Sequence, residues 1–183
     1  MTQNQRYNFT AGQAPDYWNP NPEHPDHRFA LGRVLTPSRS LNPLVVIAMN
    51  PSYADHSESD RTVNTVIAAS SQLGHDGWLM LNLYPERRTK PNMLGAFDAV
   101  LWARNWAVID DVLDTFAVNE VLGAWGNPPN HTIREALKRT RTALHARGTR
   151  VYHFGTLTKS GSPRHPTPRG AVWNISGSKR YLA

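Results

Sequence analysis

The sequence contains no cysteine. Disulfides, cysteine-bound zinc and cysteine-ligated iron–sulfur clusters are therefore excluded, and we expect an intracellular, cytoplasmic protein. No apolar run approaches the ~20 residues of a membrane-spanning helix, and residues 1–6 lack the apolar core of a signal peptide. Glycine-rich phosphate loops and the His-Glu-x-x-His pattern are also missing, so we expect neither a metal nor a cofactor.

Acidic residues are scarce in the last third of the chain. Residues 131–183 contain eleven Lys and Arg against one acidic residue, whereas residues 1–130 contain nine against thirteen. A basic end on a slightly acidic body is typical of a face that binds a polyanion, which predicts DNA or a nucleotide as partner. The alternative is a solvated basic surface without a partner.

The length of 183 residues is enough for one well-buried core. Residues 1–27, rich in Pro, Asn and Asp, are expected to form an irregular arm, and residues 28–183 a single α/β domain. Apolar runs predict strands, and helical spacing predicts helices between them. The expected strands are 44–49, 77–83, 118–125 and 150–154, with an edge strand within 28–35, and the expected helices are 62–73, 103–116 and 131–147.

This alternation predicts a three-layer α/β/α fold with a central, mainly parallel four-stranded sheet. Ligand sites of such sheets lie at the carboxyl ends of the strands, where polar clusters occur in this sequence. Asn50 and Pro51 follow the first buried strand, and the amide could hold a water, read a base edge or merely cap the loop. Asp55 could act as a general base or hold a cation, whereas Asp60 is better placed as a helix N-cap.

Asn82 ends the second buried strand, where a buried amide is costly unless it is hydrogen-bonded. It could read a base edge or simply begin a turn. Two later loops are basic: 86–91, which grips phosphates or forms surface salt bridges, and 156–166, which combines hydroxyl groups, cations and His165. The second loop predicts an anion-facing segment, with an exposed disordered loop as the alternative.

Several motifs resemble those of a bacterial and phage family known as domain-of-unknown-function family 1643, over about residues 28–166. They are Met49-Asn50-Pro51-Ser52, Ser59-Asp60-Arg61-Thr62, Leu81-Asn82-Leu83-Tyr84, Ala124-Trp125-Gly126 and Thr158-Lys159-Ser160-Gly161-Ser162-Pro163-Arg164-His165-Pro166. More distantly, the Asn-Pro after the first strand, the Asn ending an apolar strand and the late His-Pro are similar to the uracil-DNA glycosylase superfamily.

The distant resemblance implies a uracil-DNA-glycosylase-like fold and hydrolysis of the N-glycosidic bond of uracil or a modified base in DNA. It implies catalytic roles for Asn50, Asp55 and His165 and binding of a flipped base by Pro51, Ser52, Tyr53, Asn82 and Tyr84. It implies phosphate contacts from Lys159, Arg164 and Arg169, and the two basic loops add Arg87, Arg88 and Ser160 as candidate phosphate-binding residues. Two alternatives stay open: an enzyme acting on free nucleotides or nucleobases, and a noncatalytic nucleic-acid-binding module of the same fold.

Overall fold

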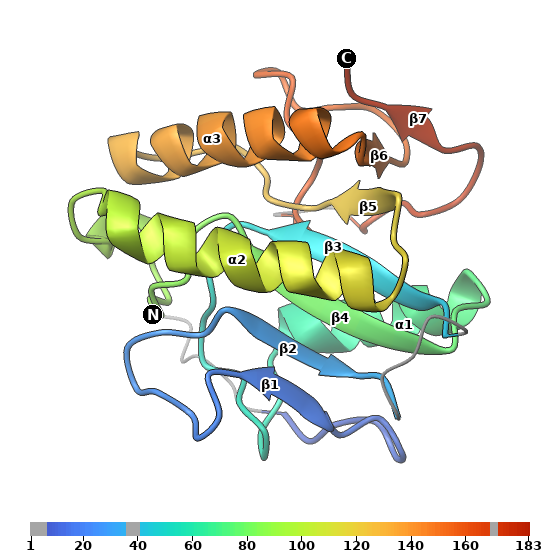
Figure 1. The fold of residues 1–183 in the computed structure, drawn as a ribbon. Helices are drawn as coiled ribbons and strands as arrows, with labels where there is room; N and C mark the ends of the chain where they lie inside the picture. Colours follow the sequence, from blue (N-terminus) through green and yellow to red (C-terminus); the bar gives the residue numbers. More distant parts are fainter. Residues whose placement is uncertain (1–6, 36–40, 169–171) are drawn as a thin grey trace.

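A computed structural model describes residues 7–35, 41–168 and 172–183. A seven-stranded sheet forms the middle of the molecule, and helices cover both of its faces (Figure 1). The strands are β1 (Tyr17–Asn19), β2 (Ala30–Arg33), β3 (Pro43–Ala48), β4 (Gly77–Asn82), β5 (Glu120–Gly123), β6 (Arg150–His153) and β7 (Arg180–Tyr181). The helices are α1 (Arg61–Gln72), α2 (Ala99–Thr115) and α3 (His131–Arg147), with a short 3₁₀ turn at Pro91–Met93.

The strand order is β1-β2-β4-β3-β5-β6-β7. The four central strands β4, β3, β5 and β6 run parallel, as their separation by helices predicted. The α/β class is therefore confirmed, but the expectation of a four-stranded, uracil-DNA-glycosylase-like sheet is wrong. Antiparallel strands extend the sheet on both sides: β2 and then β1 beyond β4, and β7 beyond β6.

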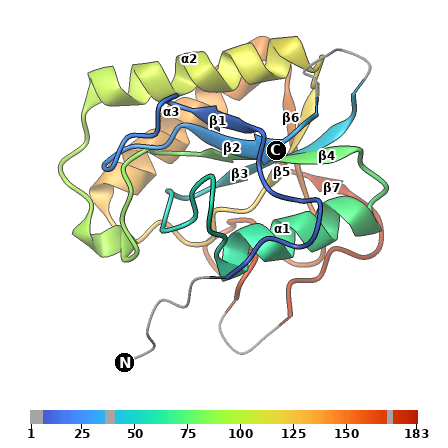
Figure 2. The same ribbon diagram turned by 90° about the horizontal axis from the view of Figure 1, so that it is seen from below.

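The two faces of the sheet carry separate cores. Helices α2 and α3 cover one face and α1 covers the other (Figure 2). Because successive side chains of a strand point to opposite faces, Leu79 and Leu81 of β4 pack under α2 and α3, whereas Trp78 and Met80 pack under α1. The same alternation places the side chain of Asn82 on the α1 face.

Local capping explains where the helices begin. Asp60 Oδ1 accepts a hydrogen bond from the Val63 backbone N–H at 2.8 Å, which confirms the predicted N-cap of α1. Helix α2 begins earlier than the predicted residue 103, because the Asp98 carboxylate accepts hydrogen bonds from the N–H groups of Val100 and Leu101. Gly148, at φ +78°, ends α3 in the left-handed conformation that glycine adopts readily.

The described part of the N-terminal arm packs against the domain. Strand β1 pairs with β2, and Tyr7 exchanges two backbone hydrogen bonds with Ser59, at 3.0 and 2.7 Å. Glu23 accepts a hydrogen bond from the His56 N–H at 2.9 Å. The arm thus lies against the loop that follows β3. None of the helices that the structure describes is both long and apolar enough to cross a membrane.

Candidate functional site at the carboxyl edge of the sheet

The four parallel strands all end at one edge of the sheet, on the side from which α2 and α3 start (Figure 1). The loops that follow them are 49–60 after β3, 83–98 after β4, 124–130 after β5 and 154–179 after β6. All of the candidate residues that the structure describes lie in these loops or at the end of β4. The parallel topology therefore gathers motifs that are more than 100 residues apart in the sequence.

Asn82 is the most unusual polar residue at this edge. Its side chain is fully buried, and neither its Nδ2 nor its Oδ1 has a hydrogen-bond partner among the described residues. A buried amide without partners costs about 1–3 kcal/mol of stability. An amide kept at such a cost needs an explanation, and binding of a polar ligand is one of the few.

Asn105 of α2 fixes the backbone beside Asn82. It is also fully buried, and its Nδ2 donates to the carbonyl oxygens of Asn82 at 2.8 Å and Leu83 at 3.4 Å. Asn105 was not among the residues predicted from the sequence. It could have been recognised as an amide within an apolar helical stretch of the sequence. In the structure α2 buries this amide against the end of β4.

Asn50 ties two of the loops together. Its Nδ2 donates to the carbonyl oxygens of Pro51 at 3.0 Å, Glu86 at 3.3 Å and Arg88 at 2.8 Å. The Arg88 backbone N–H donates in turn to Pro51 O. The amide nitrogen is thus occupied by the protein, and the oxygen Oδ1 is the atom of Asn50 that can orient a water.

The Asp55 carboxylate shapes its own loop. Its Oδ1 accepts hydrogen bonds from the Ser57 backbone and hydroxyl groups, both at 2.8 Å, and from Glu58 N–H at 2.7 Å. Partial burial acts to raise the pKa of Asp55, but these hydrogen bonds outweigh it and hold the pKa below its ordinary value. Asp55 is therefore ionised at neutral pH.

Asp55 also belongs to a group that could hold a metal. Its carboxylate, that of Glu23 and the ring of His56 offer ligand atoms within 4.8 Å of one another. However, the His56 ring and Glu23 are already joined by a 2.9 Å hydrogen bond. A cation would have to replace that contact.

His165 lies between the end of β5 and the start of α1. A Cβ added to Gly126, just after β5, would lie 3.3 Å from His165 Cβ, so the histidine packs directly against this glycine. His165 Nδ1 accepts a hydrogen bond from the Thr167 N–H at 3.1 Å, which places the proton of the neutral ring on Nε2. Burial lowers the pKa of His165, although nearby Asp60 and the Thr167 contact oppose that shift.

Arg28 is a buried cation that the sequence analysis missed. It is 3% exposed, its guanidinium donates to Ala54 O, and its Nε has no partner within the described residues. Burial lowers its pKa to about 10 against the opposing charge of Asp60, so it remains protonated at neutral pH. An arginine directly before the apolar run Phe29–Leu31 was the available signal.

Two predicted base-binding residues have contacts within the protein. The Tyr84 ring is buried, and its hydroxyl accepts a hydrogen bond from Asp98 N–H at 3.0 Å, at the start of α2. Tyr53 is 42% exposed, and its carbonyl oxygen accepts a hydrogen bond from Arg87 at 3.1 Å. Pro51 is buried and Ser52 half-buried in the same loop.

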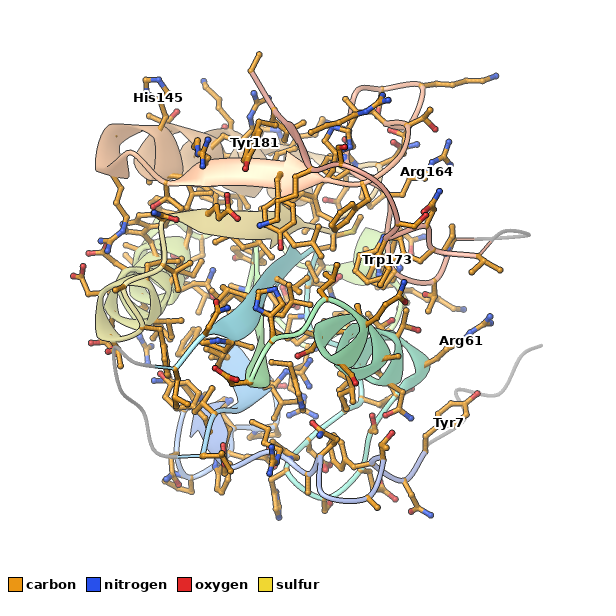
Figure 3. The ribbon with its side chains drawn as sticks, turned by 90° about the vertical axis from the view of Figure 1, so that its right-hand side faces the viewer. Tyr7, Arg61, His145, Arg164, Trp173 and Tyr181 are labelled. Atoms are coloured by element: carbon orange, nitrogen blue, oxygen red, sulfur yellow. The ribbon has the colours of Figure 1, made fainter. Side chains whose placement is uncertain are left out.

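The predicted phosphate-binding residues differ in how they are held. Arg87 bonds the carbonyls of Tyr53 and Ala54, and Arg88 forms a 2.9 Å salt bridge with Glu86. In the loop after β6, Ser160 donates to Asn127 Oδ1 at 2.6 Å and Arg164 to Thr156 O at 3.0 Å. Lys159 is exposed, and Arg169 lies outside the described residues. Figure 3 places Arg164 and Arg61 on the α1 side of the molecule.

Comparison with family models gives a match over residues 28–167 to the family described as "Protein of unknown function (DUF1643)". The chain belongs to the DUF1643 family. Comparison with curated proteins and with solved structures gives no match. The span that defines this DUF1643 protein contains Asn50, Asn82 and His165, whereas none of the three comparisons supports the distant glycosylase resemblance.

The site of the DUF1643 protein combines three chemical capacities. A buried amide can donate and accept hydrogen bonds at once, as the edge of a nucleobase requires. A neutral imidazole carries a proton on the nitrogen that the protein does not use. An ionised carboxylate and an amide oxygen, those of Asp55 and Asn50, follow the neighbouring strand. These groups suit recognition of a small polar heterocycle and stabilisation of negative charge on it.

Proposed function

We propose that this protein binds a nucleobase at the carboxyl edge of its sheet and hydrolyses the N-glycosidic bond of uracil or a modified base in DNA. One observation carries the proposal: Asn82 is fully buried, and both polar atoms of its amide lack a partner among the described residues. The edge of a pyrimidine presents a donor and an acceptor side by side, which an amide pairs with.

Entry of the base requires movement. Because Asn82 has no exposed surface, a loop over it must open before a base can reach the amide. The loop after β3 is the candidate, since it carries the exposed Tyr53 and follows the strand paired with β4. A base extruded from the DNA stack can reach such a depth, whereas a stacked base cannot.

In the proposed reaction the bond between the sugar C1′ and the base nitrogen breaks, and both electrons leave with the base. His165 donates a hydrogen bond from Nε2 to the base as negative charge develops on it. Asn50 Oδ1 orients a water whose oxygen adds to C1′, and the carboxylate of Asp55 takes the released proton. The products are an abasic sugar and the free base, which is protonated by solvent.

The charge distribution supports DNA as the substrate. The last third of the chain carries a net charge of +10, from eleven basic residues and one acidic residue. Lys159 is exposed in the same loop as His165, six residues before it, and we propose that it contacts a phosphate next to the extruded nucleotide.

The test uses end-labelled oligonucleotides that carry uracil, an oxidised or hypermodified pyrimidine, or only normal bases. We expect the wild-type protein to create alkali-labile abasic sites on at least one of them and Asn82→Leu to create none. If no substrate is cleaved, the proposed hydrolase activity is wrong. DNA binding without cleavage would then favour the binding module, and hydrolysis of free nucleosides would favour the metabolic enzyme.

A further inference from the structure

A second surface lies away from the carboxyl-edge loops. A groove of about 770 Å³ runs between α3 and the last two strands on one side of the sheet, β6 and β7. Figure 1 shows α3 beside these two strands, and Figure 3 shows His145 of α3 and Tyr181 of β7 on this side of the molecule. We call this surface the α3 groove. Its lining consists of Arg134, Leu137, Lys138, Arg141, Thr142, Leu144, His145 and the segments 148–151 and 181–183.

One wall of the α3 groove is a row of basic side chains. Arg134, Lys138, Arg141 and His145 follow one another at intervals of four, three and four residues, so they share one face of α3. At 1.5 Å per residue the row is about 16 Å long. None of the described residues that line the groove is acidic. A chain with a regular series of negative charges would complement this row.

The cations that line the groove differ in whether they have hydrogen-bond or ion-pair partners within the protein. Arg141 donates to the backbone oxygen of Ala183 at 2.6 Å, and Arg150 at the far wall lies 3.3 Å from Glu120. The side chains of Arg134 and Lys138 form no salt bridge or hydrogen bond within the described part of the chain, although the Arg139 hydrogen bond and the charge of Lys138 both contribute to lowering the pKa of Glu135. By contrast, Arg139 and Arg147, on other faces of α3, pair with Glu135 and with Asp110 and Asp114.

The floor of the α3 groove is apolar. It is formed by Leu137, Leu144, Val151 and Leu182, with Tyr181, a residue that is 42% exposed, at its side. The Tyr181 hydroxyl donates to Glu120 at 2.8 Å, and the Arg150 guanidinium lies 4.3 Å from the centre of the Tyr181 ring, so a base has the remaining exposed part of the ring to contact. Duplex DNA presents phosphates but keeps its bases stacked inside, so it would leave this floor uncovered. A single strand presents phosphates on one side and unstacked bases on the other, and bases bind to apolar and aromatic surfaces.

We infer that the α3 groove binds single-stranded nucleic acid, with phosphates along Arg134, Lys138 and Arg141 and bases against Tyr181 and the apolar floor. This inference stands apart from the proposed function, because binding in the groove needs neither Asn82 nor His165.

The test measures binding of a fluorescein-labelled oligothymidylate to the full chain by anisotropy, between about 50 and 200 mM salt. In Arg134→Gln/Lys138→Gln we expect the affinity to fall about ten-fold and the salt dependence to weaken by between one and two released ions. Arg33→Gln/Arg104→Gln removes the same charge outside the groove, and it should change the affinity by less than about three-fold.

Tyr181 tests the floor separately. Tyr181→Phe keeps the ring and should bind the oligothymidylate like the wild type, whereas Tyr181→Ala should bind about five-fold or more weakly. Three results would overturn the inference: equal loss in the two double variants, duplex of the same length binding as tightly as the single strand, or polyglutamate displacing the strand as well as unlabelled oligothymidylate does. The last result would assign the groove to an acidic peptide.

Discussion

The carboxyl edge and the α3 groove differ in whether their polar side chains are buried or exposed. At the carboxyl edge the protein buries Arg28, Asn82 and Asn105 and leaves some of their polar atoms unpaired within the described chain. In the α3 groove Arg134 and Lys138 stand in solvent around an apolar floor. The first arrangement costs stability and suits a small group of defined geometry, as we propose, whereas the second costs little and suits a charged chain.

The comparison also separates two kinds of buried asparagine. Asn105 donates to two backbone carbonyls and so holds the end of β4 in place. Asn82, the last residue of β4, has no partner for either polar atom of its side chain among the described residues. Asn105 Oδ1 also lacks a partner among the described residues, so the two asparagines differ in the hydrogen bonds of Nδ2, which Asn105 makes and Asn82 does not.

The largest effect on activity is expected when Asn82 is replaced by leucine, which has a similar size. Asn82→Leu should lower glycosylase activity about 1000-fold, since it removes hydrogen bonds made to the departing base. It should leave the free energy of unfolding unchanged or raise it, because no hydrogen bond within the described chain is lost and a buried amide is replaced by an apolar group. Activity assays and chemical denaturation measure the two quantities.

Asn105→Leu is the matched control. It leaves the carbonyls of Asn82 and Leu83 without their donor, and should lower the free energy of unfolding by about 1–3 kcal/mol. If instead Asn82→Leu is the destabilised variant, Asn82 has a structural role and the assignment of a base-binding amide is wrong.

A smaller effect is expected at His165. His165→Leu removes the Nε2 donor and should lower activity about 100-fold, whereas His165→Gln, which retains an N–H donor, should lose roughly ten-fold. Equal activity of both variants with the wild type would remove His165 from the reaction.

The titration of His165 gives an independent check on its burial. Its pKa in the folded protein lies below the value of 6.5 in the unfolded chain, so the unfolded state binds more protons between these two values. The contribution of neutral His165 to the free energy of unfolding is complete above pH 6.5, and it is lost as the pH falls through the pKa of His165 in the folded protein. Between pH 7 and 5 the wild type should therefore lose more stability than His165→Gln, measured by denaturation at each pH. Parallel pH profiles would contradict this.

The smallest effect is expected at the phosphate contacts beside the carboxyl edge. Lys159→Ala should weaken DNA binding about two- to five-fold and reduce its salt dependence by about one ion. Arg164→Ala should weaken binding similarly, but it also removes the contact with Thr156 and should loosen the loop. Unchanged affinity in Lys159→Ala would place the DNA elsewhere.

Much of the fold follows from local sequence patterns. The central strands are continuous apolar runs, and Asp60 marks the start of α1 by its side chain alone. Strands β1 and β7 were not predicted, because they are three and two residues long and exist only through antiparallel pairing with distant segments. Their pairing partners are fixed by tertiary structure, which no local pattern contains.

The positions of the candidate residues in the fold were predictable, but their contacts were not. Strand ends placed Asn50, Asn82 and His165 at one edge, since parallel strands share a direction. Which atoms the protein itself occupies depends on loops packed from elsewhere: Asn50 Nδ2 is taken by carbonyls of residues 86 and 88, and the Tyr84 hydroxyl by Asp98. The burial of Arg28 likewise requires the loop carrying Ala54.

The most direct test of the central claim observes the amide of Asn82 itself. Its ¹⁵N side-chain signals are assigned by their loss in the spectrum of Asn82→Leu, and the wild type is then titrated with uracil, the other free bases and an oligonucleotide containing uracil. The account predicts that at least one of these ligands shifts the Asn82 amide pair and leaves the Asn105 pair in place. If none of them moves the Asn82 signals, this amide does not read a base and the account is wrong.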